Sequence, residues 1–362
     1  MDLVHTGPGT LAGRYLRSYW QPIARSEEVA PGRAIPARVM SEDITAYRGE
    51  GGAPHVLAFR CAHRGTQLST GWVEGDDLRC FYHGWKYDGS GQCIEQPAEP
   101  EPFCNRIKIK SYPTREYLGL IFAYLGEGEP PAFRRYMVFE GDGMLEVGPA
   151  ITAPVNFFNR VDNAPDHAHL IFVHSPFMDS LGMPKFESEE TDWGVTTVAF
   201  FNNNIVNRTH FVIPNTTLFP ARPKMPGNPV WTDHIAWVVP SDDESYRFFQ
   251  CSLTHGATER TGRYGVVPAE GDFTKAGWEV VNGTKRITDF IKRPDIFEVQ
   301  DFVAQRGQGV IADRENEHPG RSDMGVQLLR KVWEREMRRL EAGRPLKEWS
   351  IPEGLIATLQ PE

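Results

Sequence analysis

The stretch CAHRGTQLSTGWVEGDDLRCFYH, residues 61–83, places two cysteines and two histidines on two short segments. Cys61 and His63 open the stretch, sixteen residues follow, and Cys80 and His83 close it. Two thiolates and two imidazoles are the ligand set of a [2Fe–2S] cluster in which the cysteines hold one iron and the histidines hold the other. The sequence therefore predicts such a cluster, held between two loop tips by these four residues.

A structural zinc ion is the alternative, because two cysteines and two histidines also form a closed tetrahedral site. Zinc fingers usually place both cysteines first and both histidines second, with a longer spacing between the histidines. Here each loop supplies one thiolate and one imidazole, and a glycine follows each histidine, at Gly65 and Gly84. These glycines let the backbone turn close to the sulfides. The pattern favours the two-iron cluster, and a zinc-stabilised binding module without catalysis stays open as the second interpretation.

The bulk composition sets the class of protein. With 362 residues, of which 40% are hydrophobic and 24% charged, the chain can form two domains with separate cores. The net charge of −9 argues against a nucleic-acid surface. No apolar run approaches a membrane span, and the N-terminus lacks the features of a secretion signal. Cys93, Cys104 and Cys251 are then expected to be reduced thiols of a cytoplasmic protein.

The domain organisation follows from changes in local composition. Short strand-like runs broken by Gly, Pro and Asp extend over residues 39–124, as in a small all-β domain of hairpins. Residues 126–136, GEGEPPAFRRY, are rich in Gly, Pro and charge and mark a boundary. We therefore expect a cluster domain over 21–130 and a second domain over 131–362, on which an N-terminal segment, 1–20, packs.

The second domain is expected to be α+β, with a large antiparallel sheet covered by helices. Long strand-like runs lie in mid-chain, between predicted helices. We expect helices around residues 162–174, from Pro294 onward, and over residues 323–343, where apolar residues recur at helical spacing and Gly343 ends the helix.

A second metal site is predicted at NRVDNAPDHAHLIFVHSP, residues 159–176, which contains three of the chain's eleven histidines. Taken alone, the stretch is typical of a polar helix face without a metal. Beside a one-electron cluster, something must receive the electrons and activate oxygen, and a ferrous ion bound by two histidines and one carboxylate does this. Helical periodicity alone favours His167 and His174, seven residues apart on one face.

The wider sequence resembles a known family. Residues 59–93, FRCAHRGTQLSTGWVEGDDLRCFYHGWKYDGSGQC, resemble the Rieske domain of the ring-hydroxylating oxygenases. Residues 7–29, GPGTLAGRYLRSYWQPIARSEEV, resemble the amino end of the phthalate dioxygenase branch. With the histidine motif, the resemblance covers nearly the whole chain. It implies the terminal oxygenase (alpha) component of a Rieske non-haem iron system, using dioxygen and electrons from an NAD(P)H-dependent reductase or a ferredoxin to oxygenate an organic substrate.

The resemblance also implies a ligand set for the mononuclear iron. The family's spacing, Asp, two residues, His, four residues and His, falls on Asp166, His169 and His174. Residues five apart on an ideal α-helix point about 140° away from each other. Both histidines reach one iron only if the helix breaks or widens just before His174, and Pro176 favours such a break. His167 is then left outside the ligand set, in a supporting or structural role.

In the family, the third iron ligand is an aspartate on a late helix. Within RPDIFEVQDFVAQRGQ, residues 293–308, Asp301 stands at this position. Asp295 and Glu298, one to two turns earlier, are the alternatives, and Asp295 is better explained as an acid stabilised by the helix dipole in the first turn.

Asp166 has a different implied task, as a catalytic residue in electron transfer. In the family, the aspartate at this position bridges a cluster histidine of a neighbouring subunit to an iron-binding histidine, within a head-to-tail trimer. Carried over, Asp166 would accept hydrogen bonds from the partner subunit's His83 and from His169 of its own chain. Asp162, one helical turn earlier, is expected to support a metal-binding histidine.

The electron source is expected to be a separate protein. The glycines of GPGTLAG, residues 7–13, follow no strand and have the wrong spacing for a dinucleotide site. Neither a flavin site nor a nicotinamide site is evident in the sequence.

Substrate-binding residues are the least determined feature. In NIVNRTHFVIPNTTLF, residues 204–219, alternate residues of a strand line one face, and Arg208, His210 and Asn215 are candidate substrate contacts. An arginine can clamp a carboxylate, so an aromatic carboxylate is the favoured substrate among aromatic or cyclic molecules. Hydroxylation, dihydroxylation and demethylation share the same motifs. A Rieske-type electron-transfer or redox-sensing protein without oxygenase activity is the alternative function.

Overall fold

The computed structural model describes residues 1–174, 184–201, 204–221, 232–259 and 272–352. These residues form two compact units, Thr6–Phe133 and Met1–His5 together with the residues from Arg134 onward. The division falls inside the Gly- and Pro-rich stretch at residues 126–136. Met1–His5 belong to the second unit, whereas the rest of the segment 1–20 belongs to the first, where Arg17 donates hydrogen bonds to the carbonyls of Thr6 and Met40.

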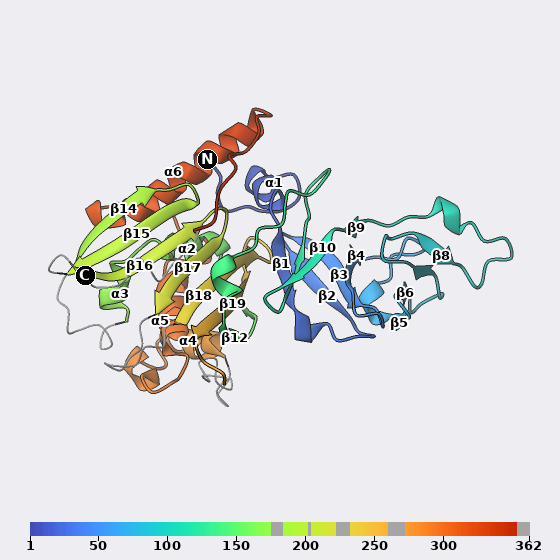
Figure 1. Ribbon diagram of the computed structural model, residues 1–362, viewed down its shortest axis with the longest axis horizontal. Helices are drawn as coiled ribbons and strands as arrows, with labels where there is room; N and C mark the ends of the chain where they lie inside the picture. The colour runs from blue at the N-terminus through green and yellow to red at the C-terminus, as the bar shows by residue number, and fades with distance from the viewer. Residues whose placement is uncertain (175–183, 202–203, 222–231, 260–271, 353–362) are drawn as a thin grey trace. The chain divides into compact units, whose positions relative to one another are not determined.

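The first unit is built from small antiparallel sheets, as Figure 1 shows. A three-stranded sheet has the order β1-β11-β10, and two four-stranded sheets have the orders β2-β3-β4-β9 and β5-β6-β7-β8. The elements are α1 (Leu11–Arg17), β1 (Gln21–Arg25), β2 (Ala34–Val39), β3 (Glu42–Arg48), β4 (Pro54–Ala58), β5 (Trp72–Glu74), β6 (Asp77–Arg79), β7 (Lys86–Tyr87), β8 (Cys93–Glu95), β9 (Ser111–Tyr112), β10 (Thr114–Tyr117) and β11 (Leu120–Ala123).

The second unit contains an eight-stranded antiparallel sheet. Its order is β12-β19-β18-β17-β16-β15-β14, and β13 also pairs with β19. The strands are β12 (Gly143–Val147), β13 (Ile151–Ala153), β14 (Lys185–Glu190), β15 (Gly194–Phe201), β16 (Asn204–Val212), β17 (Thr216–Ala221), β18 (Thr232–Pro240) and β19 (Tyr246–His255). The helices are α2 (Phe157–Asn163), α3 (His169–Phe172), α4 (Phe273–Val281), α5 (Ile296–Gly307) and α6 (Met324–Glu341).

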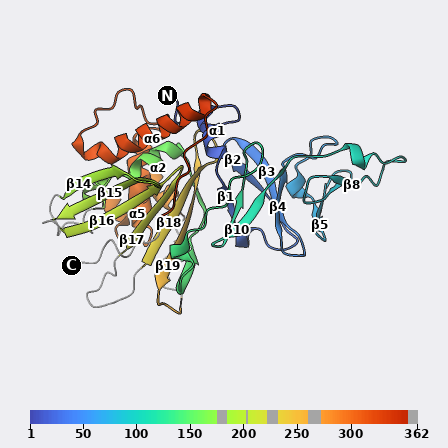
Figure 2. The same cartoon turned by 45° about the horizontal axis from the view of Figure 1, so that its top comes forward.

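The helices pack on one face of this sheet. Strand residues directly opposite each other in an antiparallel pair share a face, and successive residues alternate between faces. Thr197 is opposite Thr209, and Gly325 at the start of α6 is so close to Thr197 that a Cβ atom would lie 2.6 Å from its hydroxyl. Arg160 of α2 stacks over Phe248 of β19 on the same face. Figure 2 shows α6 lying along β14 and β15.

The expected α+β architecture with its large antiparallel sheet is confirmed, and the helix around residues 162–174 is divided. Helix α2 ends at Asn163, and the short helix α3 begins at His169 and ends at Phe172, two residues before His174. Pro165 lies in the gap. Proline has no backbone N–H to donate a helical hydrogen bond, so it favours a break there. Pro176 lies outside the described residues. No described helix is both long and apolar enough to cross a membrane.

Candidate metal centres

Two similar turns carry the four predicted cluster ligands of the first unit. In each turn a glycine amide donates to a cysteine carbonyl, from Gly65 to Cys61 over 2.9 Å and from Gly84 to Cys80 over 3.1 Å. Both glycines have φ of +74°, the left-handed conformation that glycine adopts most readily. The turns therefore bring both cysteines into the core of the unit, where each is nearly inaccessible to solvent.

The ligand candidates are arranged as two pairs. The imidazole rings of His63 and His83 contact each other, with centroids 4.4 Å apart, and His63 also stacks on Trp85 at 4.7 Å. Burial raises the pKa of Cys61, and the neighbouring thiol of Cys80 raises it further. A thiol pair beside an imidazole pair is the arrangement that two separate irons require.

Tyr87 hydrogen bonds to one of the predicted cysteine ligands. Its hydroxyl oxygen accepts the backbone N–H of Ala62 over 3.1 Å and lies 3.2 Å from the Cys61 sulfur. With its oxygen accepting, the hydroxyl can donate its proton to the sulfur. Sequence reasoning did not identify this tyrosine, because only the folded unit brings β7 beside the first loop.

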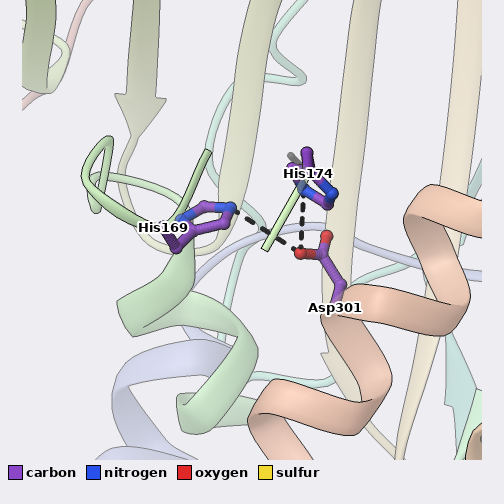
Figure 3. Close-up of side chains that lie close together, drawn as sticks. All are labelled: His169, His174 and Asp301. Atoms are coloured by element: carbon purple, nitrogen blue, oxygen red, sulfur yellow. Dashed lines mark ion pairs between the residues drawn. The ribbon is translucent and has the colours of Figure 1, made fainter. Parts of the chain in front are cut away.

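In the second unit, two histidines and one aspartate converge. The ligand atoms of His169, His174 and Asp301 all lie within 4.8 Å of one another, and no other group of this kind occurs among the described residues. Asp301 Oδ1 lies 3.6 Å from His169 Nε2 and 3.3 Å from His174 Nε2. Figure 3 shows the three side chains directed toward one point from separate segments. This set is the two-histidine, one-carboxylate arrangement of non-haem ferrous sites.

Two neighbours hold the converging side chains in place. His174 Nδ1 lies 2.9 Å from Gln300 Oε1, and an amide oxygen only accepts, so Nδ1 carries a proton and Nε2 is the ring nitrogen directed at Asp301. Arg160 Nη1 donates to Asp301 Oδ2 over 2.8 Å. Burial raises the pKa of Asp301, but the Arg160 guanidinium and the two histidines outweigh it and hold that pKa well below its usual range. Sequence reasoning missed Gln300 and Arg160, which have no motif of their own.

His167 points elsewhere. Its Nε2 lies 2.9 Å from the Thr209 hydroxyl, and the side chain is buried. Burial and the neighbouring His169 lower the pKa of His167 to about 3, so its imidazole is neutral. The structure therefore places His167, two residues before α3, against Thr209 of the sheet and outside the converging group.

Asp166 is placed beside His169. Its Oδ1 accepts the backbone N–H of Ala168 over 2.9 Å, and its Oδ2 lies 3.7 Å from His169 Nδ1. Burial raises the pKa of Asp166, but His169 and the backbone donors outweigh it and lower that pKa overall. The carboxylate is thus available in its ionised form next to the imidazole.

Asp162 has partners different from those expected. Its carboxylate accepts from Arg314 Nε over 3.0 Å and from Arg330 Nη2 over 2.7 Å. These bonds tie α2 to the C-terminal part of the unit, and Gln300 rather than Asp162 contacts a histidine of the converging group. The reason is the gap after α2, which separates Asp162 from the helix that carries His169.

The two alternative carboxylates, Asp295 just before α5 and Glu298 on it, also lie outside the group. Asp295 forms a two-point ion pair with Arg293, at 2.8 Å for each hydrogen bond. Burial raises the pKa of Glu298. Among the described acidic residues of α5, only Asp301 joins the histidines.

The three substrate candidates do not face the converging group. Strand alternation puts Arg208 and His210 on the face opposite Thr209, which contacts His167 on the helix side. His210 is instead hydrogen bonded to Thr196 over 2.8 Å. The Asn215 amide donates to the Val238 carbonyl over 2.8 Å, within the sheet. The sequence pattern could not indicate which face of β16 the helices cover.

The face that does point toward the helices carries a different set of side chains. Phe219 is opposite His234, and His234 is opposite Ser252, on the same face as Phe248. The rings of Phe219 and His234 stack with centroids 4.8 Å apart. The described side chains on this face of β14 to β19 include no lysine or arginine.

Comparison with known proteins extends over both units. Residues 19–113 match the model of the Rieske [2Fe-2S] domain. The chain is 31% identical to the phenoxybenzoate dioxygenase subunit alpha of Ectopseudomonas oleovorans, over 92% of this chain and 84% of that protein. It is 29% identical to the 5,5'-dehydrodivanillate O-demethylase oxygenase subunit of Sphingobium sp. (strain NBRC 103272 / SYK-6), over 95% and 81%.

A solved structure shares the fold. NdmA of Pseudomonas putida CBB5 superposes with a TM-score of 0.69 at 16% identity, covering 92% of this chain and 94% of that one. Because the similarity continues far beyond the cluster domain, a bare electron-transfer protein does not account for the chain. The resemblance seen in the sequence is confirmed: the chain belongs to the Rieske non-haem iron oxygenases, as an oxygenase component that uses a [2Fe–2S] cluster and a mononuclear iron.

Proposed function

We propose that Cys61, His63, Cys80 and His83 hold the [2Fe–2S] cluster. The two thiols are buried neighbours and the two imidazoles contact each other, so each pair suits one iron of the cluster. A tetrahedral zinc ion instead needs all four ligand atoms around one point. The converging group found among the described residues is in the second unit and includes none of these four, which supports the two-iron assignment.

We further propose that His169, His174 and Asp301 hold the mononuclear iron. The single observation that carries this proposal is their convergence within 4.8 Å from α3, from the residues after it, and from α5. When bound, the ferrous ion supplies the chemistry of dioxygen activation. The chain's own contribution is to orient His174 through Gln300, to hold Asp301 through Arg160, and to shield these groups from most of the solvent.

The proposed reaction is oxygenation of an aromatic or cyclic organic molecule, by hydroxylation, dihydroxylation or demethylation. The two relatives compared above are named a dioxygenase and an O-demethylase, so both outcomes occur among similar chains. The helix-facing side of the sheet presents aromatic rings, at Phe219 and Phe248, together with the Ser252 hydroxyl. Arg208 faces away, so the observation that favoured a carboxylate on the substrate no longer supports it.

The proposed assembly is a head-to-tail homotrimer in the cytoplasm, reduced by a ferredoxin or an NAD(P)H-dependent reductase. Large aromatic side chains are exposed around the tip of the second cluster loop: Trp72 is 50%, Phe81 59% and Tyr82 54% exposed. Trp72 contacts Phe81, and Tyr82 contacts His83. An exposed aromatic group beside a cluster ligand suits docking against another protein surface. We propose that Asp166 of the neighbouring subunit lies at that surface.

Metal analysis and product analysis test the proposal together. Two irons in the cluster and one at the second site give about three per chain. We expect the Asp301→Ala variant to hold about two irons, to keep the visible spectrum of the cluster and to lose oxygenation. The assay supplies NADH, a broadly acting reductase and a panel of aromatic substrates, and it detects oxygen incorporation by mass. Full iron content in Asp301→Ala would show that the second site lies elsewhere.

A further inference from the structure

Asp301 divides its two oxygens between different partners. Oδ2 accepts a hydrogen bond from Arg160 at 2.8 Å. Oδ1 faces both imidazoles, 3.6 Å from His169 Nε2 and 3.3 Å from His174 Nε2, and it is buried without accepting a hydrogen bond. A buried acceptor without a donor is costly, and a cation at the point where the three side chains meet would satisfy Oδ1.

Arg160 is itself firmly held. It lies on α2 and is largely shielded from solvent. The same Nη1 that binds Asp301 also donates to the Asn163 side chain. The guanidinium stacks over the Phe248 ring, 5.0 Å from its centroid. A planar cation fixed on one side by a ring and on another by an amide restricts the rotation of the carboxylate that it binds.

We propose that Arg160 is a positioning residue that makes Asp301 bind the mononuclear iron through Oδ1 alone. The proposal rests on the assignment of His169, His174 and Asp301 as the iron site. A carboxylate that binds through one oxygen takes one coordination position, whereas binding through both oxygens takes two. Arg160 occupies Oδ2 and so keeps a further position on the iron open for dioxygen or substrate.

The chain offers a matched control for this role. Arg314 also pairs with an aspartate, Asp162, at 2.9 Å, and it also stacks over a phenylalanine, Phe158, at 5.1 Å. Both arginines have mostly buried side chains. Only Arg160 contacts a member of the converging group. A loss that reflects a missing buried arginine in general would therefore appear equally in an Arg314 variant.

The experiment compares Arg160→Met, Arg160→Lys and Arg314→Met in the purified oxygenase with its cluster intact. The mononuclear site is emptied by a chelator and titrated anaerobically with Fe(II). Outer partners of metal ligands typically contribute 10- to 100-fold in metal affinity, so we expect Arg160→Met to bind Fe(II) about 10- to 100-fold more weakly than the parent. Arg160→Lys keeps the positive charge but lacks the planar guanidinium group, so its Fe(II) affinity should lie between those of the parent and Arg160→Met. The Fe(II) affinity of Arg314→Met should match that of the parent.

Cobalt(II) loaded into the emptied site reports the number of ligand atoms, because its visible bands weaken as that number rises. We expect weaker bands in Arg160→Met, where Asp301 can use both oxygens, and parent-like bands in Arg314→Met. Parent-like Fe(II) affinity or parent-like cobalt bands in Arg160→Met would overturn the proposal, as would equal losses in both arginine variants. In Arg160→Ala, added guanidinium ion should restore Fe(II) binding, and failure of this rescue in a protein with a normal cluster spectrum also counts against it.

The iron-site assignment and the role of Arg160 can be tested separately. If Asp301→Ala keeps its mononuclear iron, the iron-site assignment is wrong. If Asp301→Ala loses that iron while Arg160→Met binds it like the parent, only the role of Arg160 is wrong.

Discussion

At the scale of single residues, both proposed metal sites depend on side chains that are not proposed ligands. Tyr87 contacts the Cys61 sulfur and Gln300 fixes the His174 imidazole. Each partner contributes one hydrogen bond, and each acts on a group whose orientation or electron density the metal senses. These partners tune the proposed sites, and removing them tests the sites without removing a ligand.

We predict that Tyr87→Phe lowers the reduction potential of the cluster. A hydrogen bond to a ligand sulfur stabilises the more negative, reduced cluster, so its loss favours the oxidised state. If the hydrogen bond stabilises the reduced cluster relative to the oxidised cluster by about 1.4 kcal/mol, its loss lowers the potential by about 59 mV for a one-electron couple. We expect a shift of this order. Potentiometric titration of the cluster's visible spectrum measures it. Tyr47→Phe, which loses a hydrogen bond to the Asp76 carbonyl in the same core, should leave the potential unchanged.

A second prediction separates the histidines. His169→Ala and His174→Ala should each lose the mononuclear iron and all oxygenation while keeping the cluster spectrum. His167→Ala should retain iron and part of the activity, because its imidazole contacts Thr209 rather than Asp301. Iron content and product yield are measured for all three variants. If His167→Ala empties the site and His169→Ala does not, the proposed ligand set is wrong.

At the scale of elements, the end of α3 at Phe172 lets His169 and His174, five residues apart, approach one carboxylate. Pro165 lies earlier, in the gap between α2 and α3, which comes before both histidines. The start of α6 packs directly against this region. A Cβ atom at Gly325 would lie 2.7 Å from the Pro165 carbonyl oxygen and 2.6 Å from the Thr197 hydroxyl. The backbone after α2 is therefore held in place by close contact with another helix.

We predict that Gly325→Ala destabilises the second unit by about 1–3 kcal/mol, the usual cost of overpacking, and weakens iron binding by displacing the segment before His169. Thermal unfolding and iron content measure the two effects. Gly307→Ala on α5 is the control, since an added Cβ there meets nothing within 4 Å and alanine favours a helix over glycine. Equal stability of the two variants would contradict the proposed close contact.

At the scale of the whole molecule, the proposed function requires an electron to pass from a cluster in one unit to an iron in another. Asp166 is next to His169 and is held in its ionised form by that imidazole and by backbone donors. In the proposed trimer, its carboxylate would also accept from the partner subunit's His83. Two charge-assisted hydrogen bonds would fix both rings and join the two metal sites.

We predict that Asp166→Asn leaves both metal sites occupied and the trimer largely formed, because the amide is nearly the same size as the carboxylate. Product formation should fall by about 10- to 100-fold, while the reductase still reduces the cluster. Light scattering, iron content, cluster reduction and turnover are measured on the same preparation. Parent-like turnover by Asp166→Asn, or an active monomeric parent, would contradict the bridging role.

The sequence by itself determined the kind of protein. The Cys-X-His and Cys-X-X-His pairs are local, so spacing alone predicts two loop tips that carry a [2Fe–2S] cluster. The roles of Asp166, His169, His174 and Asp301 came only from the resemblance to the family, since spacing alone favoured His167 with His174, whereas the α+β architecture followed from the sequence pattern. Chemistry that depends on residue type and short spacing is visible in a sequence because it needs no knowledge of the fold.

Only the tertiary structure decided how distant segments meet. Arg160 on α2 and Gln300 on α5 reach the converging group through helix packing, and neither has a sequence signal. Arg208 and Thr209 are neighbours in the chain but lie on opposite faces of β16. Alternation along a strand separates its residues into two faces, but which face the helices cover depends on how the whole sheet packs.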